Sequence, residues 1–125
     1  MIQYKDENFI VELIDGIIHV VWLKERYEYE EVDFIIKKRI EMCDGKAYPI
    51  FTDLRLLKTG SRQARERLAG KDAGVGVIAV AVLVSTRVQQ TLYSFFHAIY
   101  KAPAKAKIFS DKSKALEWLE QFKEE

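Results

Sequence analysis

The chain has 125 residues, of which 49% are hydrophobic and 31% charged, and its formal net charge is +1. This length fits one ordinary domain with a single core, and the composition is that of a globular protein rather than a disordered one. The near balance of 20 basic and 19 acidic residues argues against a nucleic-acid partner. The single cysteine, Cys43, excludes an internal disulfide and a metal site built from several cysteines.

The start of the chain, MIQYKDENF, lacks the basic and apolar regions of a secretion signal, so we expect a cytoplasmic protein. No low-complexity linker and no internal repeat divides the sequence. Residues 1–125 are therefore predicted to form a single domain.

In chain order, two β-rich runs come first, at residues 9–14 (FIVELI) and 17–23 (IIHVVWL). The Asp15-Gly16 pair between them is typical of a two-residue hairpin turn, because both central positions of that turn take a positive φ. We expect the two runs to be antiparallel strands.

A helix is predicted next, because apolar residues recur at helical spacing: Val32, Ile35, Ile36, Ile40 and Cys43. Gly45 is a suitable C-terminal stop for this helix. A strand follows at residues 48–54 (YPIFTDL), and Ser61 can cap a short, strongly charged helix at residues 62–68.

Residues 73–84 (AGVGVIAVAVLV) are twelve small or apolar residues without a charge. A half-exposed strand would alternate polar and apolar residues, so this run indicates a strand covered on both faces, at residues 77–84. It is too short for a membrane-spanning helix, which needs about 20 apolar residues. We expect it to be the central parallel strand.

The last third of the chain is predicted to hold a helix at residues 87–100, ended by Pro103, and a short edge strand at residues 106–109. Ser110 or Asp111 then caps a final helix. The buried face of that helix is predicted to be Ala115, Leu116, Leu119 and Phe122.

The elements alternate in the order ββαβαβαβα, which predicts an α/β fold with parallel pairing and right-handed crossovers. We expect a mixed, mostly parallel sheet of four or five strands covered by helices. The first hairpin strand would be its antiparallel member.

Motifs of one known family run through most of the chain, and most densely through residues 50–119. They are Asp53-Leu54-Arg55, Ser61 with Ala64-Arg65, the run AVAVLV with Ser85 and Arg87, Phe95-Phe96, Lys101-Ala102-Pro103 and IFSDKSKALEWL. With these motifs the chain resembles a STAS-type domain, the SpoIIAA-like fold of the bacterial anti-sigma-factor antagonists. The resemblance implies a regulatory domain, not an enzyme, that acts through a protein partner.

The same resemblance suggests a phosphorylation site. In the antagonists, a partner kinase phosphorylates a serine at the start of the helix after the third strand, and this controls docking. Ser61 or Thr59 stands at that position here. The chain departs from the family pattern, because residues 58–62 read KTGSR where the antagonists have an acidic residue and paired small residues followed by glycine.

A candidate binding site follows from the predicted topology. In an open α/β sheet, function concentrates beyond the carboxyl ends of the parallel strands, which selects residues 53–61, 85–87 and 110–111. Free N–H groups and the positive dipole end of a helix N-terminus suit an anion. The candidate residues for a small anionic ligand or a protein partner are Arg55, Ser61, Arg62, Ser85, Thr86 and Arg87.

An alternative interpretation is purely structural. Under it, Ser61, Ser85 and Ser110 only cap helices, and the arginines pair with nearby carboxylates, namely Asp53, Glu66 or Asp72. No glycine-rich phosphate loop occurs in the sequence.

The predicted helix at residues 87–100 suggests a second kind of site. It carries more aromatic side chains than a core of this size readily buries, so part of it can line an apolar pocket or a contact surface. The candidate pocket residues are Leu92, Phe95, Phe96, Ile99 and Tyr100. Lipid-carrying relatives of the fold suggest a lipid-like ligand for such a pocket.

Catalytic and metal chemistry find no support in the pattern. His19 and His97 have no carboxylate or cysteine at metal-ligand spacing, and no G-x-S-x-G elbow occurs. Asp53 fits a turn-capping role better than a catalytic one, and Cys43 is interpreted as a small buried hydrophobe. We therefore expect no enzyme activity, no cofactor and no metal.

The leading hypothesis from the sequence is a non-enzymatic regulatory or interaction domain that binds a protein partner or a small anionic ligand, with phosphorylation at Ser61 as a further prediction. The alternative is an apolar small-molecule binding domain. The hairpin edge and the aromatic helix each offer a surface for a homodimer, and the sequence does not choose between them.

Overall fold

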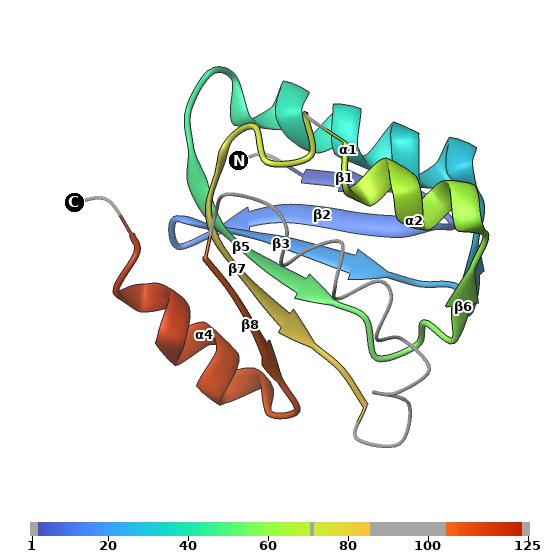
Figure 1. The fold of residues 1–125 in the computed structure, drawn as a ribbon. Coiled ribbons are helices and arrows are strands. Elements are labelled where there is room, and N and C mark those ends of the chain that lie inside the picture. Colours follow the sequence, from blue (N-terminus) through green and yellow to red (C-terminus); the bar gives the residue numbers. More distant parts are fainter. Residues whose placement is uncertain (1–2, 71, 86–104, 124–125) are drawn as a thin grey trace.

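A mixed sheet forms the middle layer of the fold in the computed structural model, which describes residues 3–70, 72–85 and 105–123 (Figure 1). In the described part, six strands lie in the order β1 (Gln3–Lys5), β2 (Phe9–Ile14), β3 (Ile17–Trp22), β5 (Tyr48–Asp53), β7 (Val77–Leu83) and β8 (Lys105–Phe109). The first three strands pair antiparallel, and β3, β5, β7 and β8 pair parallel. The predicted α/β fold with a mixed, mostly parallel sheet is confirmed.

The sheet has one strand more than predicted. Strand β1 pairs with β2 through the register Gln3↔Glu12 to Lys5↔Ile10. Its three residues, QYK, show no apolar alternation, so the sequence gives no sign of a strand. Its backbone pairs with the free edge of β2, Tyr4 packs against the core, and the strand becomes one edge of the sheet.

The first hairpin forms as predicted. Asp15 and Gly16 take φ values of 50° and 80°, and the register runs from Phe9↔Trp22 to Ile14↔Ile17. Alternation then decides which face each side chain occupies, because Phe9 and Val11 are buried while Ile10 between them is only half-buried.

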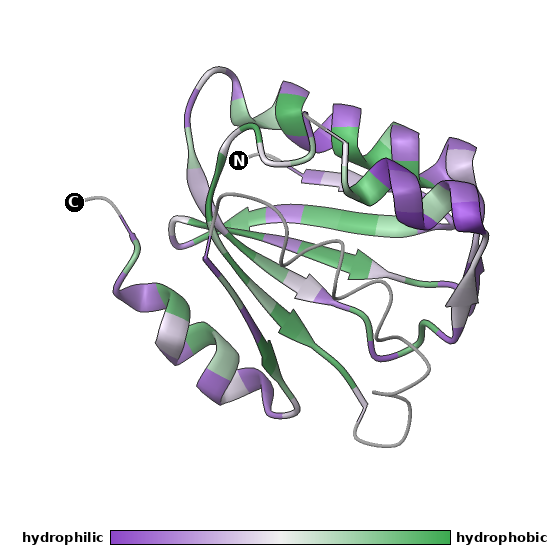
Figure 2. Cartoon of the chain, viewed as in Figure 1, coloured by the Kyte–Doolittle hydropathy of each residue, from purple (hydrophilic) through white to green (hydrophobic). Residues whose placement is uncertain are grey.

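Helices cover both faces of the sheet (Figure 1). Helices α1 (Tyr29–Cys43) and α2 (Arg62–Leu68) lie over one face, and α4 (Lys112–Glu120) lies over the other. Figure 2 shows the same division by hydropathy, with hydrophobic residues concentrated on the strands and hydrophilic ones on the outer sides of the helices. The predicted helix at residues 87–100 falls outside the described residues.

The caps of α2 and α4 are among those predicted, whereas the cap at the end of α1 lies one residue before the predicted Gly45. Helix α1 starts after Glu28, which forms a capping box with Glu31, and ends at Cys43; its C-cap is Asp44, whose φ of 50° and ψ of 49° are left-handed. The N–H of Ala64 donates to Oγ of Ser61 at 3.0 Å at the start of α2. Asp111 rather than Ser110 caps α4, accepting from the N–H groups of residues 113 and 114.

Strand β7 is an interior strand, paired with β5 on one side and β8 on the other, one place from the sheet edge rather than at its centre. Ala79, Ala81 and Leu83 pack toward α4, while Val80 and Val82 pack toward α1. The unbroken apolar run therefore reflects two covered faces, as predicted. The extended segment begins at Val77.

A second, two-stranded parallel sheet was not predicted. Strands β4 (Arg26–Tyr27) and β6 (Thr59–Gly60) pair at the side of the main sheet (Figure 1). Tyr27 anchors them, since it is 0% exposed and its hydroxyl donates to the carbonyl of Asn8 at 2.6 Å. Burial raises the pKa of Tyr27 to about 12, so this hydroxyl keeps its proton.

No helix in the described ranges is long and apolar enough to cross a membrane.

Candidate functional site

The predicted anion site lies at the rim where β5 and β7 end side by side. The two strands meet there in the register Asp53↔Leu83, so the segments after them leave at the same edge. Arg55 Nη2 lies 2.8 Å from Asp53 Oδ2. Arg62 Nε lies 3.7 Å from Glu66 Oε2.

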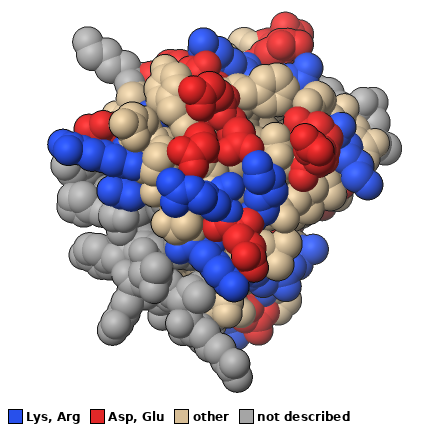
Figure 3. Space-filling view, turned by 90° about the vertical axis from the view of Figure 1, so that its right-hand side faces the viewer, with Lys and Arg blue, Asp and Glu red and all other residues tan. Residues whose placement is uncertain are grey.

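These ion pairs are the ones that the structural interpretation anticipates. Figure 3 shows that basic and acidic side chains are interleaved on this side of the molecule. Ser61 is engaged as the cap of α2, and Ser85 is half-buried just after β7. Thr86 and Arg87 lie outside the described residues, and the anion site and the phosphorylation of Ser61 stay predictions.

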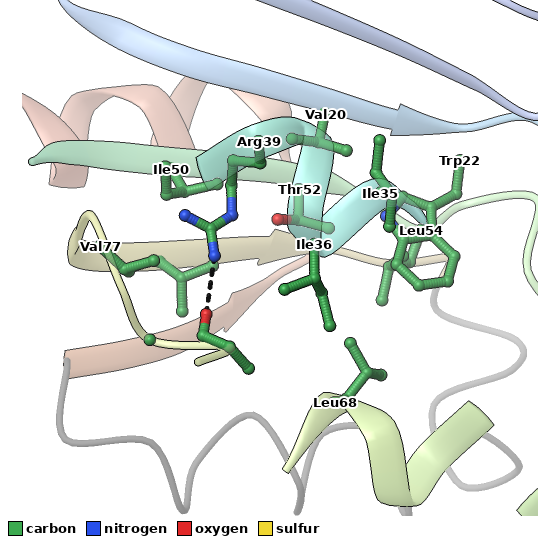
Figure 4. A pocket seen from close by; sticks show the side chains of 13 residues that line it. Val20, Trp22, Ile35, Ile36, Arg39, Ile50, Thr52, Leu54, Leu68 and Val77 are labelled. Atoms are coloured by element: carbon green, nitrogen blue, oxygen red, sulfur yellow. Dashed lines mark hydrogen bonds between the residues drawn. The ribbon is translucent and has the colours of Figure 1, made fainter. Parts of the chain in front are cut away.

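A cavity lies elsewhere, between the sheet, α1, α2 and the turn before β7 (Figure 4). Its volume is about 100 Å³. All of the lining residues except Arg39 and Thr52 are apolar or glycine: Val20, Trp22, Ile35, Ile36, Ile50, Leu54, Leu68, Ala73, Gly74, Val77 and Val80. None of them belongs to the pocket set predicted on the aromatic helix, whose residues all lie outside the described ranges.

The cavity is present because the turn before β7 carries small residues. Ala73 and Gly74 face the gap between α1 and β7 and bring too little volume to fill it. The lining residues of β3 and α1 are buried, whereas Leu68, Val77 and Val80 are half-buried. The cavity therefore opens toward the α2–β7 side.

Arg39 is the charged group of this cavity, and it is only 6% exposed. Its Nη1 donates to the carbonyl of Val75 at 2.6 Å and its Nη2 to that of Ala73 at 2.8 Å, the latter drawn in Figure 4. Burial lowers the pKa of the guanidinium, and Cys43 partly offsets this. An arginine stays protonated in such surroundings.

Arg39 was not predicted as a site residue, although the sequence carries a signal for it. Ile36, Arg39 and Cys43 are three and four residues apart, so the arginine lies within the apolar stripe of α1 rather than on its charged side. An arginine at such a position is a buried charge whose partners must come from the tertiary structure.

Thr52 supplies the other polar group, a hydroxyl on β5. The side chain is half-buried, and within the described part of the chain this hydroxyl has no hydrogen-bond partner. In Figure 4 it points to the side of the cavity on which the Arg39 guanidinium lies.

An ion-pair network joins α1, α2 and the turn before β7, all of which line the cavity. The guanidinium of Arg67, in α2, donates to Asp33 of α1 at 2.8 Å and to both carboxylate oxygens of Asp72 at 2.7 and 2.9 Å. It thereby ties two helices to the turn that carries Ala73. The Arg67 guanidinium lowers the pKa of both carboxyl groups from their usual value, and Lys37 adds to the effect on Asp33.

This network predicts that the free energy of unfolding depends on pH, and that Arg67→Met should weaken this dependence. A carboxyl group whose pKa is lowered by folding adds stability above its unfolded pKa, and this stability is lost as the pH falls through the folded pKa. We expect the wild-type free energy of unfolding to drop between about pH 5 and pH 2. In Arg67→Met the drop should be shallower. Urea denaturation at each pH measures both slopes.

Arg62→Met is the matched control, because Arg62 also pairs with a carboxylate but its side chain is 80% exposed. This variant should keep the wild-type slope. Equal slopes for wild type and Arg67→Met would contradict the prediction.

His19 is not among the residues that line the cavity. His19 is on β3 with its ring 5.2 Å from that of Phe51, and burial and Lys112 lower its pKa. Among the described side chains, no three His, Cys, Asp or Glu residues gather to hold a metal ion. His97 lies outside the described residues.

Comparison with known proteins supports the fold. The model of a family described as "Domain of unknown function (DUF7793)" matches residues 10–123. A solved structure from Shewanella loihica PV-4, an uncharacterized protein from the DUF3478 family with a SpoIIAA-like fold, is similar with a TM-score of 0.66 and 16% identity, over 95% of this chain and 99% of that one. The predicted STAS-type, SpoIIAA-like fold is thereby confirmed. No curated protein matches the chain.

Proposed function

The chain belongs to the DUF7793 family, and we propose that its function is to bind a small apolar molecule in the cavity between α1, α2 and the sheet, as a non-enzymatic regulatory domain. Of the two functions that the sequence suggests, the cavity supports binding of an apolar ligand, although it is not the pocket predicted at residues 87–100, which lie outside the described residues. At the rim, by contrast, Arg55 and Arg62 already face carboxylates.

The observation that supports this function is the cavity itself. A volume of about 100 Å³ is of the order of an apolar protein cavity of about 150 Å³ that stays dry and binds benzene. A ring or a short acyl chain therefore fits. Apolar pockets with a few convergent polar groups are the usual form of small-molecule sites.

The polar groups favour binding over catalysis. Among its described lining residues the cavity has a guanidinium and a hydroxyl, but neither a carboxylate nor an imidazole. A guanidinium and a hydroxyl can orient a ligand, whereas general acid–base chemistry at neutral pH needs a group that gains and loses a proton there. A bound ligand would stabilise one form of the domain, and a partner protein can recognise that form.

Trp22 provides a direct test, because it lines the cavity while Trp118 packs on the other face of the sheet. In a Trp118→Phe variant, toluene should change the emission of Trp22 in a saturable way. Toluene should also raise the melting temperature by a few degrees at concentrations of about ten times Kd, since ligand binding to the folded state adds RT ln(1 + [L]/Kd).

The matched control is Trp22→Phe, which leaves Trp118 as the reporter and should show no change in emission. Val80→Phe, which fills the cavity from β7, should abolish the response of Trp22 in the Trp118→Phe background. An unchanged Trp22 signal up to the solubility limit of toluene, or equal responses from both tryptophans, would count against the proposed function.

A further inference from the structure

We infer that the ligand of this cavity is a small amphipathic carboxylate, with its head group on Arg39 and Thr52 and its ring or short chain among the apolar side chains. This inference rests on the proposed function, because it assigns a chemical class to the ligand of the same cavity.

Arg39 carries a positive charge in the interior of the protein. A buried charge is costly unless it is paired and hydrogen-bonded. Within the described part of the chain, no Asp or Glu oxygen lies within 4.0 Å of this guanidinium, and its hydrogen bonds go to the carbonyls of Ala73 and Val75. These carbonyls hold the group in place, and Cys43 and Asp72 also act on it, but no carboxylate of the described residues pairs with it directly.

The nearby acidic residue is already engaged. Asp72 acts on Arg39 through its charge, but both of its carboxylate oxygens accept hydrogen bonds from Arg67. Arg39 has five N–H donors, and the two carbonyls use only part of them. Arg39 is itself one of the residues that line the cavity.

The hydroxyl of Thr52 lines the same cavity and has no hydrogen-bond partner among the described residues. It can donate to an oxygen that also accepts from Arg39. A guanidinium presents parallel N–H groups that match the two oxygens of a carboxylate. Figure 4 shows the two polar groups on the same side of the space, with Ile36 and Val77 beside them.

The charge and the volume of the cavity limit the class of anion. One guanidinium balances one negative charge, and the described lining holds no lysine or second arginine that a doubly charged phosphate would need. The small volume limits the apolar part to about the size of a benzene ring or a short chain. Benzoate is therefore a suitable probe, with benzamide and toluene as its neutral counterparts.

Calorimetric titration of the full chain with these three compounds tests the inference. We expect benzoate to bind about tenfold or more tightly than benzamide or toluene, as hydrogen bonds to a charged group predict. Thr52→Val should weaken benzoate several-fold and leave toluene unchanged, whereas Thr52→Ser should keep the preference for benzoate. Arg39→Met should abolish the preference and retain toluene binding.

Arg39→Met loses the bonds to Ala73 and Val75, so its fold is checked by circular dichroism. If it does not fold, binding to the wild-type protein is measured at several pH values instead: the ratio of benzoate affinity to toluene affinity should fall as benzoate itself becomes protonated. Equal affinities for benzoate and toluene, or an unaffected Thr52→Val, would overturn the inference and leave the cavity function standing. Absence of binding by all three compounds would overturn both.

Discussion

Replacing Phe9 by alanine should lower the free energy of unfolding by about 3–5 kcal/mol. Phe9 is 0% exposed, and its ring lies 5.0 Å from that of Tyr27 in a stacked pair and 5.3 Å from that of Trp22 in an edge-to-face pair. The variant loses the buried apolar area and leaves a cavity beneath two aromatic side chains. Urea denaturation followed by far-UV circular dichroism measures the change.

Phe34→Ala is the matched control, because the same atoms are removed from a side chain that is 40% exposed. Its ring contacts Tyr4 at 5.6 Å on the surface of α1, so we expect a loss of about 1 kcal/mol. Similar losses in the two variants would contradict the assignment of Phe9 to the core. Because Trp22 also lines the cavity, the proposed function predicts that Phe9→Ala in addition weakens binding of toluene.

Gly76→Ala should destabilise the fold by roughly 2–4 kcal/mol, through a strained backbone and a steric clash. Gly76 takes a φ of +77°, and a Cβ there would lie 3.1 Å from Sγ of Cys43 and 3.2 Å from the carbonyl of Lys46. The residue joins the cavity turn to β7, and its carbonyl accepts from the N–H of Tyr48 at 2.9 Å. The midpoint of urea denaturation reports the loss.

Gly45→Ala separates the two contributions. Gly45 has nearly the same φ, +79°, but a Cβ there would meet nothing within 4 Å. We expect its loss to be about 1–2 kcal/mol, from the left-handed backbone alone. If Gly45→Ala costs as much as Gly76→Ala, close packing of the turn against the end of α1 is not a source of stability.

Local chemistry made several elements predictable. Asp15-Gly16 specifies its hairpin turn, because few other residue pairs accept two successive positive φ values. Ser61 caps α2 as predicted, since its hydroxyl reaches the N–H three residues on. Asp111 and Ser110 were both suitable caps by type, and only the observed backbone shows which side chain accepts the N–H groups of α4.

Segments without a local signal escaped prediction. Strand β1 and the β4–β6 pair are short: β1 pairs with the free edge of β2, and β4 and β6 pair with each other in a separate sheet. The main sheet therefore has a strand more than its apolar runs indicate. The pocket predicted on residues 92–100 lies outside the described residues, and the cavity that is described uses β3, β5, β7, α1 and α2 instead.

By itself, the sequence determined the class of fold, the hairpin, the helices α1, α2 and α4, and a strand β7 covered on both faces. These follow from periodicity, turn residues and caps, each of which acts within a few residues. Only the tertiary structure decided that Arg39 reaches the carbonyls of Ala73 and Val75, and that small residues of the turn leave a cavity beside Thr52. The physical reason is that burial, cavity volume and charge pairing depend on which distant segments pack together, and no local pattern encodes that.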